Sequence, residues 1–293
     1  MMRLAWLLLG LMLAAAPARA GVSVTDDTGR RVVLPAAAQR IVSLAPHVTE
    51  LLYAAGAGGK LVGAVEYSDY PPAAQALPRV GSSSAVDIEA VAALKPDLVI
   101  AWQSGTRVAQ YGQLDRLGIP VFVSEPRSLD DIPRTLELLG RLAGTTKDAE
   151  AAALDFRTRR DRLAARYASR PPVGVFYQIW DRPPMTVNGQ HLISAVMALC
   201  GGRNVFADLA MLAPTVTEEA VLAAAPEVIV ASGTADARPA WLDAWRRWRS
   251  LPAVARDNLY FIPPEQLQRN TPRVLDGAAQ LCEQLEQARA KRR

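Results

Sequence analysis

Apolar and polar residues alternate over residues 22–34, on either side of the segment Asp26-Asp27-Thr28-Gly29. Alternation with a period of two, interrupted by residues that favour turns, predicts an antiparallel hairpin. Farther along, short continuous apolar runs take turns with segments whose apolar residues recur at helical spacing, an order typical of an α/β fold with a mainly parallel sheet. We expect strands at 41–44, 61–65, 97–101 and 120–123, and helices after Pro46, at 87–94, at 106–117 and, capped by Ser128, at 128–143.

A long segment without glycine or proline follows, at residues 145–169. With Thr145 as its cap it predicts a single helix of about 24 residues, some 36 Å long. A second α/β series comes after it, with strands expected at 173–177, 227–230 and 259–262 and helices at 191–199, at 217–224, from Pro239 and at 273–290. We therefore predict two α/β lobes with mainly parallel sheets, residues 21–144 and 171–293, joined by one long helix at 145–170.

Two segments of the chain resemble one another without a gap, VDIEAVAALKPDLVIAW at 86–102 and VTEEAVLAAAPEVIVAS at 216–232. Each predicts a capped helix, a proline and a buried strand, and each has a glutamate, Glu89 or Glu219, in the first helical turn. A glutamate at this place ordinarily interacts only with the helix dipole. The symmetric placement favours a further interpretation, in which the two carboxylates dock on two like partner subunits.

Residues 1–20 are typical of a secretory signal peptide, with a positive charge, an apolar run and a small-x-small motif at 18–20. No cysteine follows the cleavage site, so we expect a soluble exported chain that starts near Gly21 without a lipid anchor. No later run predicts a membrane span. The 33 basic residues include Arg3 and Arg19, which lie in the predicted signal peptide. The basic residues of the exported part therefore nearly balance the 29 acidic residues, and this small net charge argues against nucleic acid as a partner.

Cysteine and histidine are both scarce. In an oxidising compartment the pair Cys200 and Cys282 favours one disulfide over two buried free thiols. His47 and His191 are far apart and have no second ligand at helical spacing, so we expect no metal site. The chain also lacks a nucleophile elbow, a phosphate loop and a dinucleotide-binding motif. We therefore expect neither a cofactor nor catalysis.

Two aromatic residues follow predicted strands at the carboxyl edge of a parallel sheet, where ligands bind in open α/β folds. Tyr67 lies on a loop braced by Pro71-Pro72, and Trp102 comes directly after its strand. We expect the two rings to converge on one cleft rim, although the tyrosine could also belong to an ordinary connecting turn. His47 either faces the same cleft or is satisfied by its neighbours.

A second aromatic group, Trp241, Trp245 and Trp248, has the spacing of one helix face. A stripe that packs into the core is the favoured interpretation, and a ligand surface is the alternative.

With these features in view, the chain resembles the periplasmic cobalamin-binding proteins of ABC importers, members of the class III, helical-backbone substrate-binding proteins. The motifs RIVSLAPHVTELLYAAGAGGKLVG, YSDYPP, ALKPDLVIAW, LCGGRNVF and TPRVLDGAAQLC stand in the order and spacing of cobalamin receptors. The resemblance covers nearly all of the exported chain. It implies two lobes on a rigid linking helix, little hinge closure and a corrinoid held between the lobes.

Several residues match functional positions of the family. The resemblance implies that Tyr67 and Trp102 contact the corrin ring from the N-terminal lobe. Met185, Gln266 and Arg269 fall where the wall of the C-terminal lobe is built. The resemblance also implies that the two first-turn glutamates meet arginines of a permease dimer in the inner membrane, and that the cysteines form a disulfide within one lobe.

The chain departs from cobalamin receptors of the best-known type at four positions where they have aromatic rings, occupied here by Ser83, Met185, Ala213 and Gln266. Each missing ring removes about 0.5–1.5 kcal/mol of stacking beyond area burial. Trp180 is a candidate to replace one of them. The ligand implied is therefore cobalamin, a precursor such as cobinamide, or another large chelate.

Taken together, these observations predict a periplasmic, monomeric receptor that delivers a corrinoid, cobalamin first, to an ABC permease. An iron-siderophore or haem receptor of the same fold is the alternative. An exported enzyme is the third hypothesis, and it lacks a nucleophile–base pair or a metal constellation to support it.

Overall fold

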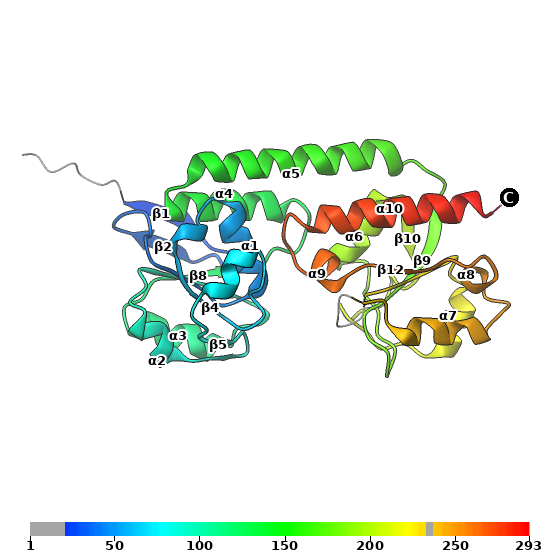
Figure 1. Cartoon of the computed structure of the whole chain (residues 1–293), viewed down its shortest axis with the longest axis horizontal. Coiled ribbons are helices and arrows are strands. Elements are labelled where there is room, and N and C mark those ends of the chain that lie inside the picture. The colour runs from blue at the N-terminus through cyan, green and yellow to red at the C-terminus, as the bar shows by residue number, and fades with distance from the viewer. Residues whose placement is uncertain (1–20, 233–236, 293) are drawn as a thin grey trace, which may run out of the picture.

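The computed structural model describes residues 21–232 and 237–292, and the predicted signal peptide lies outside them. Two four-stranded parallel sheets form the centres of two lobes (Figure 1). The strand order is β4-β3-β7-β8 in the N-terminal lobe and β10-β9-β11-β12 in the C-terminal lobe. The strands are β3 (Ile41–Ser43), β4 (Leu61–Ala64), β7 (Leu98–Trp102), β8 (Val121–Ser124), β9 (Val173–Gln178), β10 (Gly202–Asn204), β11 (Val228–Ala231) and β12 (Leu259–Phe261). The predicted α/β fold with parallel sheets is confirmed.

The two sheets have the same topology. In each, the first strand along the chain is an inner strand, the second is the edge strand beside it, and the third and fourth lie on its other side. The repeated segments occupy equivalent places, since α2 (Ile88–Ala93) leads into β7 and α7 (Glu218–Ala224) leads into β11. Both helices have the expected cap, because Asp87 accepts from a backbone N–H at 2.9 Å and Thr217 from another at 3.2 Å.

Helix α5 (Thr146–Tyr167) has 22 residues and passes along both lobes, beside α4 and α10 (Figure 1). It is about 33 Å long at 1.5 Å per residue. Helices α4 and α5 approach very closely at Gly140, where an added Cβ would lie 2.2 Å from that of Ala149. The remaining helices are α1 (Pro46–Ala54), α3 (Val108–Arg116), α4 (Asp131–Ala143), α6 (Leu192–Leu199), α8 (Pro252–Ala255), α9 (Pro264–Leu267), α10 (Val274–Ala290) and the 3-10 helices η1 (Gly58–Lys60), η2 (Pro72–Ala76) and η3 (Ala240–Arg247). The division of the chain into lobes at residues 144 and 171 stays a prediction.

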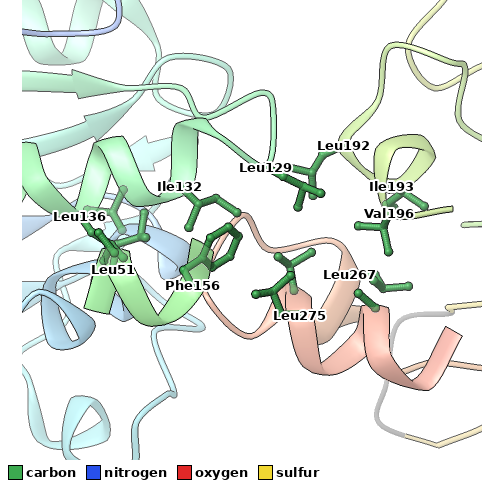
Figure 2. Close-up of a cluster of buried hydrophobic side chains, with 14 of the residues drawn as sticks. Leu51, Leu129, Ile132, Leu136, Phe156, Leu192, Ile193, Val196, Leu267 and Leu275 are labelled. Atoms are coloured by element: carbon green, nitrogen blue, oxygen red, sulfur yellow. The ribbon is translucent and has the colours of Figure 1, made fainter. Parts of the chain in front are cut away.

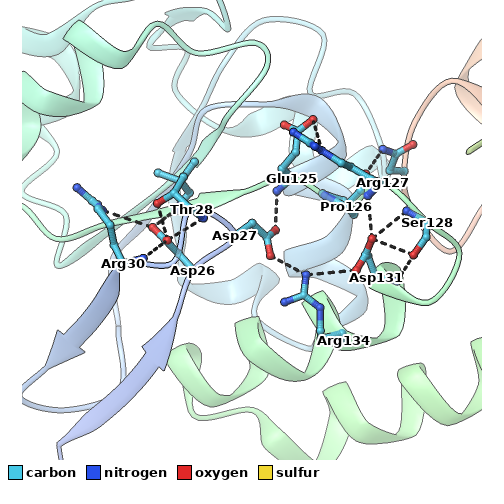
Figure 3. A network of polar contacts seen from close by, with 12 residues as sticks. Asp26, Asp27, Thr28, Arg30, Glu125, Pro126, Arg127, Ser128, Asp131 and Arg134 are labelled. Atoms are coloured by element: carbon cyan, nitrogen blue, oxygen red, sulfur yellow. Dashed lines mark hydrogen bonds and ion pairs between the residues drawn. The ribbon is translucent and has the colours of Figure 1, made fainter. Parts of the chain in front are cut away.

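The predicted N-terminal hairpin forms, with β1 (Val22–Thr25) antiparallel to β2 (Arg31–Leu34). Its acidic turn is anchored on the N-terminal lobe (Figure 3). The buried Asp26 accepts from the backbone N–H of Val123 in β8 at 3.3 Å, and Asp27 accepts from the N–H of Glu125 at 2.6 Å and from Arg134 of α4 at 2.6 Å. The hairpin therefore fixes the backbone at the carboxyl end of β8. A second, two-residue hairpin pairs β5 (Gly81–Ser82) with β6 (Ala85–Val86).

One apolar cluster runs through both lobes without a break. Figure 2 shows it passing from Leu51 and Leu136 in the N-terminal lobe, through Phe156 of α5 and Leu275 of α10, to Val196 of the C-terminal lobe. Phe156 is 1% exposed and Leu275 is fully buried. The lobes therefore share a core along the linking helices, while each sheet has a separate cluster on its other face.

One predicted helix cap is wrong. The hydroxyl of Thr145 does not cap α5 but donates to the carbonyl of Ala55 at 2.6 Å, which offers it a better partner than the helix end. Ser128 lies in a turn before α4, which begins at Asp131. Its hydroxyl accepts from the backbone N–H of Asp131 at 3.3 Å, and the Asp131 carboxylate accepts from the backbone N–H of Ser128 at 2.9 Å, the reciprocal pair of a capping box.

The tryptophan segment after Pro239 is a 3-10 helix, η3, and its rings pack on the core of the C-terminal lobe. Trp245 is buried, with its ring 5.8 Å from that of Phe176, and Trp241 and Trp248 are partly buried against the same cluster. The core interpretation of these rings is confirmed, although the helix type is not. The edge strand β10 was not predicted, because its sequence Gly-Arg-Asn has no apolar pattern.

Candidate functional site

A cavity of 500 Å³ lies between the two lobes. On the N-terminal side it is lined by residues that follow β4, and on the C-terminal side by residues that follow β12. The lining residues are Tyr67, Asp69, Tyr70, Gln75, Pro264, Glu265, Gln268, Arg269 and Arg273. The cavity is therefore placed at the carboxyl ends of strands from both sheets, where open α/β folds bind ligands.

The loop of Tyr67 presents its ring to solvent over a fixed base. Tyr67 has a left-handed backbone with φ of 62° and is 75% exposed. Beneath it, Ser68 is fully buried and hydrogen-bonded to the hydroxyl of Thr49 in α1 at 3.1 Å. Arg79 donates to the carbonyls of Val65 and Ser68 from the other side. The loop is thus held at its base while the aromatic ring stays available for contact.

Arg269 joins the two lobes across the cavity. Its Nη1 donates to Glu50 Oε1 of α1 and to Asp69 Oδ1, both at 2.8 Å, and its Nη2 lies 3.3 Å from the carbonyl oxygen of Tyr67. Burial by itself would raise the pKa of Asp69, but the hydrogen bond and the charge of Arg269 outweigh burial and hold that pKa below its ordinary value. Asp69 therefore stays ionised and helps to fix the guanidinium.

Arg273, at the start of α10, adds a second cation to this wall. Its Nη1 is 3.5 Å from the same Glu50 oxygen, its Nη2 is 3.9 Å from Glu265, and its guanidinium stacks 4.1 Å from the ring centre of Tyr70. A stacked arginine with two acidic neighbours has little freedom to move. Both arginines that line the cavity are thus already paired with acids of the protein.

Trp102 ends β7 and packs against His47, the second residue of α1. The two rings meet edge to face with their centres 5.2 Å apart. Gly105 makes room for the indole, since an added Cβ there would lie 1.9 Å from it. Burial, and after it the positive charge of Arg269, lowers the pKa of His47 to about 4. His47 is therefore a neutral, buried neighbour of Trp102.

The turn that follows Trp102 is supported by the network of the N-terminal hairpin. Glu125 accepts from the backbone N–H of Ser104 at 2.9 Å and from its hydroxyl at 2.7 Å, and its own N–H is held by Asp27 (Figure 3). On the other side, Asn270 donates to the carbonyl of Pro126 at 2.6 Å and so ties the C-terminal lobe to the same segment. These contacts fix the backbone around the indole.

On the C-terminal side, Trp180 and Met185 are neighbours. Their backbones form a bridge, a second bridge joins Met185 to Thr215, and the Trp180 indole is 48% exposed. Gln266, in α9, is partly buried next to the lining residue Glu265. On the N-terminal side Ser83 lies in the turn of the β5–β6 hairpin.

The structure brings some of the predicted ligand residues together and leaves others apart. Tyr67 and Arg269 line one cavity, whereas Trp102 contacts His47 and Trp180 lies beside Met185. Tyr67 and Trp102 follow β4 and β7, which flank β3 in the sheet, so they share one edge without lining the same cavity. Their assignment as ligand contacts stays a prediction.

Several residues of the wall were not singled out in the sequence, among them Glu50, Asp69, Tyr70 and Arg273. Glu50 has no distinguishing signal, because a glutamate within an amphipathic helix is ordinarily exposed. Asp69 and Tyr70 stand within the YSDYPP motif, and Arg273 within the TPRVLDGAAQLC motif, so only the resemblance could have found them.

The two first-turn glutamates lie on the outer surface. Glu89 and Glu219 are both exposed, and neither forms an ion pair with a residue that the structure describes. The backbone N–H of Glu219 and then the hydroxyl of Thr217 hold the pKa of Glu219 below its ordinary value. The next-door Glu218 is instead paired with Arg247 of η3.

Cys200 and Cys282 form a disulfide that joins the end of α6 to the middle of α10, inside the C-terminal lobe. In residues 21–232 and 237–292, no group of three or more His, Cys, Asp or Glu side chains is placed to hold a metal ion. Over the same ranges, no helix has the length and apolar character needed to span a bilayer.

Two parallel α/β sheets that present their carboxyl strand ends to a shared cavity, tied together by one long helix, define a two-lobed binding protein. The chain belongs to the periplasmic binding protein family, whose model matches residues 41–266. A vitamin B12-binding protein of Vibrio cholerae is 42% identical over 249 residues, covering 85% of this chain and 89% of that protein.

Solved structures agree with this membership. The crystal structure of the periplasmic vitamin B12 binding protein of Vibrio cholerae matches with a TM-score of 0.78 and 40% identity, over 86% of this chain and 98% of that one. A periplasmic haem-binding protein from Pseudomonas aeruginosa matches with a TM-score of 0.72 and 29% identity, over 84% of this chain and 91% of that one. The fold is thus shared by a protein named for vitamin B12 binding and one named for haem binding.

Proposed function

We propose that this chain is a periplasmic receptor that captures a corrinoid, with cobalamin as its first candidate, and delivers it to an ABC permease. The observation that carries the proposal is the cavity between the lobes, with Tyr67 on one side and Arg269 on the other. The chain's 42% identity to a relative named for vitamin B12 binding supports the choice of ligand.

The chemistry of the surroundings suits such a ligand. A corrinoid has a flat macrocycle and a rim of amide groups. The partly exposed rings of Tyr67, Trp102 and Trp180 and the thioether of Met185 offer surfaces for the macrocycle. The carboxylates and guanidiniums that line the cavity offer hydrogen-bond acceptors and donors for the amides. A corrinoid is larger than the drug-sized ligands that fill such cavities, so we expect the rim residues outside the cavity to contact it as well.

Binding is tested with cyanocobalamin, haemin and a ferric hydroxamate. Cyanocobalamin should co-elute with the purified protein, release heat on titration and quench tryptophan fluorescence. Trp102→Ala should weaken its affinity roughly tenfold, because loss of area burial adds to the 0.5–1.5 kcal/mol of ring contact. Trp248→Ala, which removes a ring of the C-terminal core, serves as the control. Saturation by an iron chelate without heat from any corrinoid would refute the corrinoid assignment.

We further infer that Glu89 and Glu219 dock on the permease. They are exposed, they occupy equivalent places in the two lobes, and each could make a charge-assisted bidentate bond to an arginine. The double variant Glu89→Ala/Glu219→Ala should keep its cyanocobalamin affinity and lose uptake in cells that have the cognate importer, and the single variants should dock more weakly in a salt-dependent way. Normal uptake by the double variant would remove the docking role.

Export is part of the same proposal. We infer that residues 1–20 direct secretion and are removed, which places the receptor in the periplasm. The exported protein should begin near Gly21 when it is isolated from the periplasmic fraction and its N-terminus is sequenced. A mature chain that keeps residues 1–20 would contradict cleavage.

A further inference from the structure

The cavity between the lobes has an unusual balance of charge. Two guanidinium groups line it, those of Arg269 and Arg273, and three carboxylates lie within ion-pair distance of them, those of Glu50, Asp69 and Glu265. No lysine is among the lining residues. The wall therefore has one more acidic group than basic groups, although it contains two arginines.

Glu50 is the central acid of this arrangement. Its side chain is 2% exposed, and one of its oxygens is 2.8 Å from Arg269 and 3.5 Å from Arg273. A buried carboxylate is stable only when it is paired, and removing either partner is strongly unfavourable. Glu50 thus binds the two arginines to the N-terminal lobe, and releasing them to an incoming ligand would cost considerable free energy.

Asp69 completes the pairing from the solvent side. Its carboxylate is 2.8 Å from the same Nη1 of Arg269, and the side chain is 56% exposed. Both Nη1 hydrogens of Arg269 are therefore used by acids of the protein, and its Nη2 lies toward the carbonyl of Tyr67. A ligand that enters the cavity meets the exposed oxygens of Asp69 before it meets the guanidinium.

The consequence depends on the charge of the ligand. A carboxylate would have to displace Asp69 or approach it, and like charges placed side by side are strongly disfavoured at an interface. An amide is not repelled by Asp69, because its N–H groups can donate to carboxylate oxygens and its carbonyl can accept from the remaining arginine N–H groups.

We propose that Glu50 and Asp69 determine the charge selectivity of the site, accepting the amide rim of a neutral ligand and rejecting carboxylates by keeping Arg269 and Arg273 occupied. This inference rests on the proposed corrinoid function. It adds Glu50 and Asp69 to the site as positioning residues, which act by holding the two arginines. It also gives a physical reason why a receptor of this fold would prefer a corrinoid over haem, whose propionates need unpaired cations.

The test compares cyanocobalamin with its monocarboxylic acids, each of which has one propionamide hydrolysed to a carboxylate. Wild-type protein should bind cyanocobalamin roughly 10- to 100-fold more tightly than at least one of the acid isomers, as measured by calorimetric titration. Asp69→Asn should reduce that ratio by about tenfold, because the negative charge beside Arg269 is removed and a ligand carboxylate can displace a neutral amide from the guanidinium more easily. Haemin, which two carboxylates make anionic, should gain affinity in the same variant.

Glu50→Gln should have a larger effect in the same direction, and Glu50→Asp, which keeps the charge, should restore the wild-type preference. Because Glu50 is buried, each variant is first checked for an unchanged melting profile, and the exposed Asp69 variant carries the test if Glu50→Gln does not fold. The matched control is Asp115→Asn, which removes a partly exposed acid 2.6 Å from Arg30 on the outer side of the N-terminal lobe. Its selectivity should equal that of the wild type.

The outcomes separate this inference from the function on which it rests. If the wild-type protein does not bind cyanocobalamin, the proposed function fails. If the wild-type protein, Asp69→Asn and folded Glu50→Gln all bind cyanocobalamin and prefer it over the monocarboxylic acids by the same factor, the charge-selectivity inference is overturned and the function stands. A salt titration adds a second readout, since the discrimination should shrink as ionic strength rises.

Discussion

Removing the Cys200–Cys282 disulfide should destabilise the whole protein without altering its ligand preference. The bond closes a loop with a sequence separation of 82 residues, which contains α7, β11, η3, β12 and α9, most of the C-terminal lobe. In the chain-entropy model a loop of this length raises the free energy of unfolding by about 4.5 kcal/mol at 25 °C. Both cysteines are fully buried, so loss of packing adds to the effect when they are replaced.

The magnitude is large beside the usual 5–15 kcal/mol of domain stability. The double variant Cys200→Ala/Cys282→Ala should therefore unfold at a lower urea concentration than wild type, and its melting temperature should fall by roughly 10 °C. Urea titration followed by fluorescence measures the first, and a thermal scan measures the second. Wild-type protein refolded in reductant should behave like the variant.

Two results would refute this reasoning. Thiol titration of the denatured, unreduced protein should find no free sulfhydryl, and two free groups would show that the bond is absent. Equal urea midpoints for oxidised and reduced protein would show that the closed loop contributes nothing, because the unfolded C-terminal lobe is already compact.

Three further predictions follow from individual side chains. Phe156→Ala should cost about 3–5 kcal/mol and should lower a single urea transition, whereas two transitions of which only one moves would contradict a core shared by the lobes. His47 has a pKa of about 4 in the folded state, whereas the unfolded chain takes up a proton on this residue below about pH 6.5, so the free energy of unfolding should fall by up to about 3 kcal/mol as the pH drops from 6.5 to 4. The variant His47→Gln should flatten that pH dependence when urea titrations at pH 7 and pH 5 are compared. Gly140→Ala should destabilise the protein by about 1–3 kcal/mol, because the new Cβ would meet Ala149, and this outweighs the preference of about 1 kcal/mol that alanine has for a helix. A higher melting temperature would contradict the close packing of α4 and α5.

Much of the fold could be predicted because its signals are local. Buried parallel strands such as β7 and β11 are continuous apolar runs, and their helices have caps at Asp87 and Thr217. The signal fails where a strand or a cap depends on distant partners. Strand β10 is formed by Gly-Arg-Asn beside β9, and the hydroxyl of Thr145 donates to the carbonyl of Ala55, directly after α1.

The site was less predictable, for a similar reason. The aromatic residues Tyr67 and Trp102 follow strands directly, so the edge on which they lie could be inferred from the pattern. The pairing of Glu50 with Arg269 joins residues that are 219 positions apart and that no spacing rule connects. Sequence patterns therefore located the sheet edge at which the cavity lies, whereas the charge balance of its wall emerged only from the packing of the lobes.

The joint between the lobes bears on how a ligand would be captured. A hinge motion that widened the cavity would separate Arg269 from the buried Glu50 and Asn270 from Pro126, and it would disturb the packing of Phe156 and Leu275. Uncovering two such side chains costs on the order of 3–6 kcal/mol, before the unpaired charge is counted. Opening by this route would populate well under one molecule in a hundred. We therefore expect ligand to enter a preformed cavity whose charges are already in place, so that affinity and selectivity depend on the wall itself and not on closure.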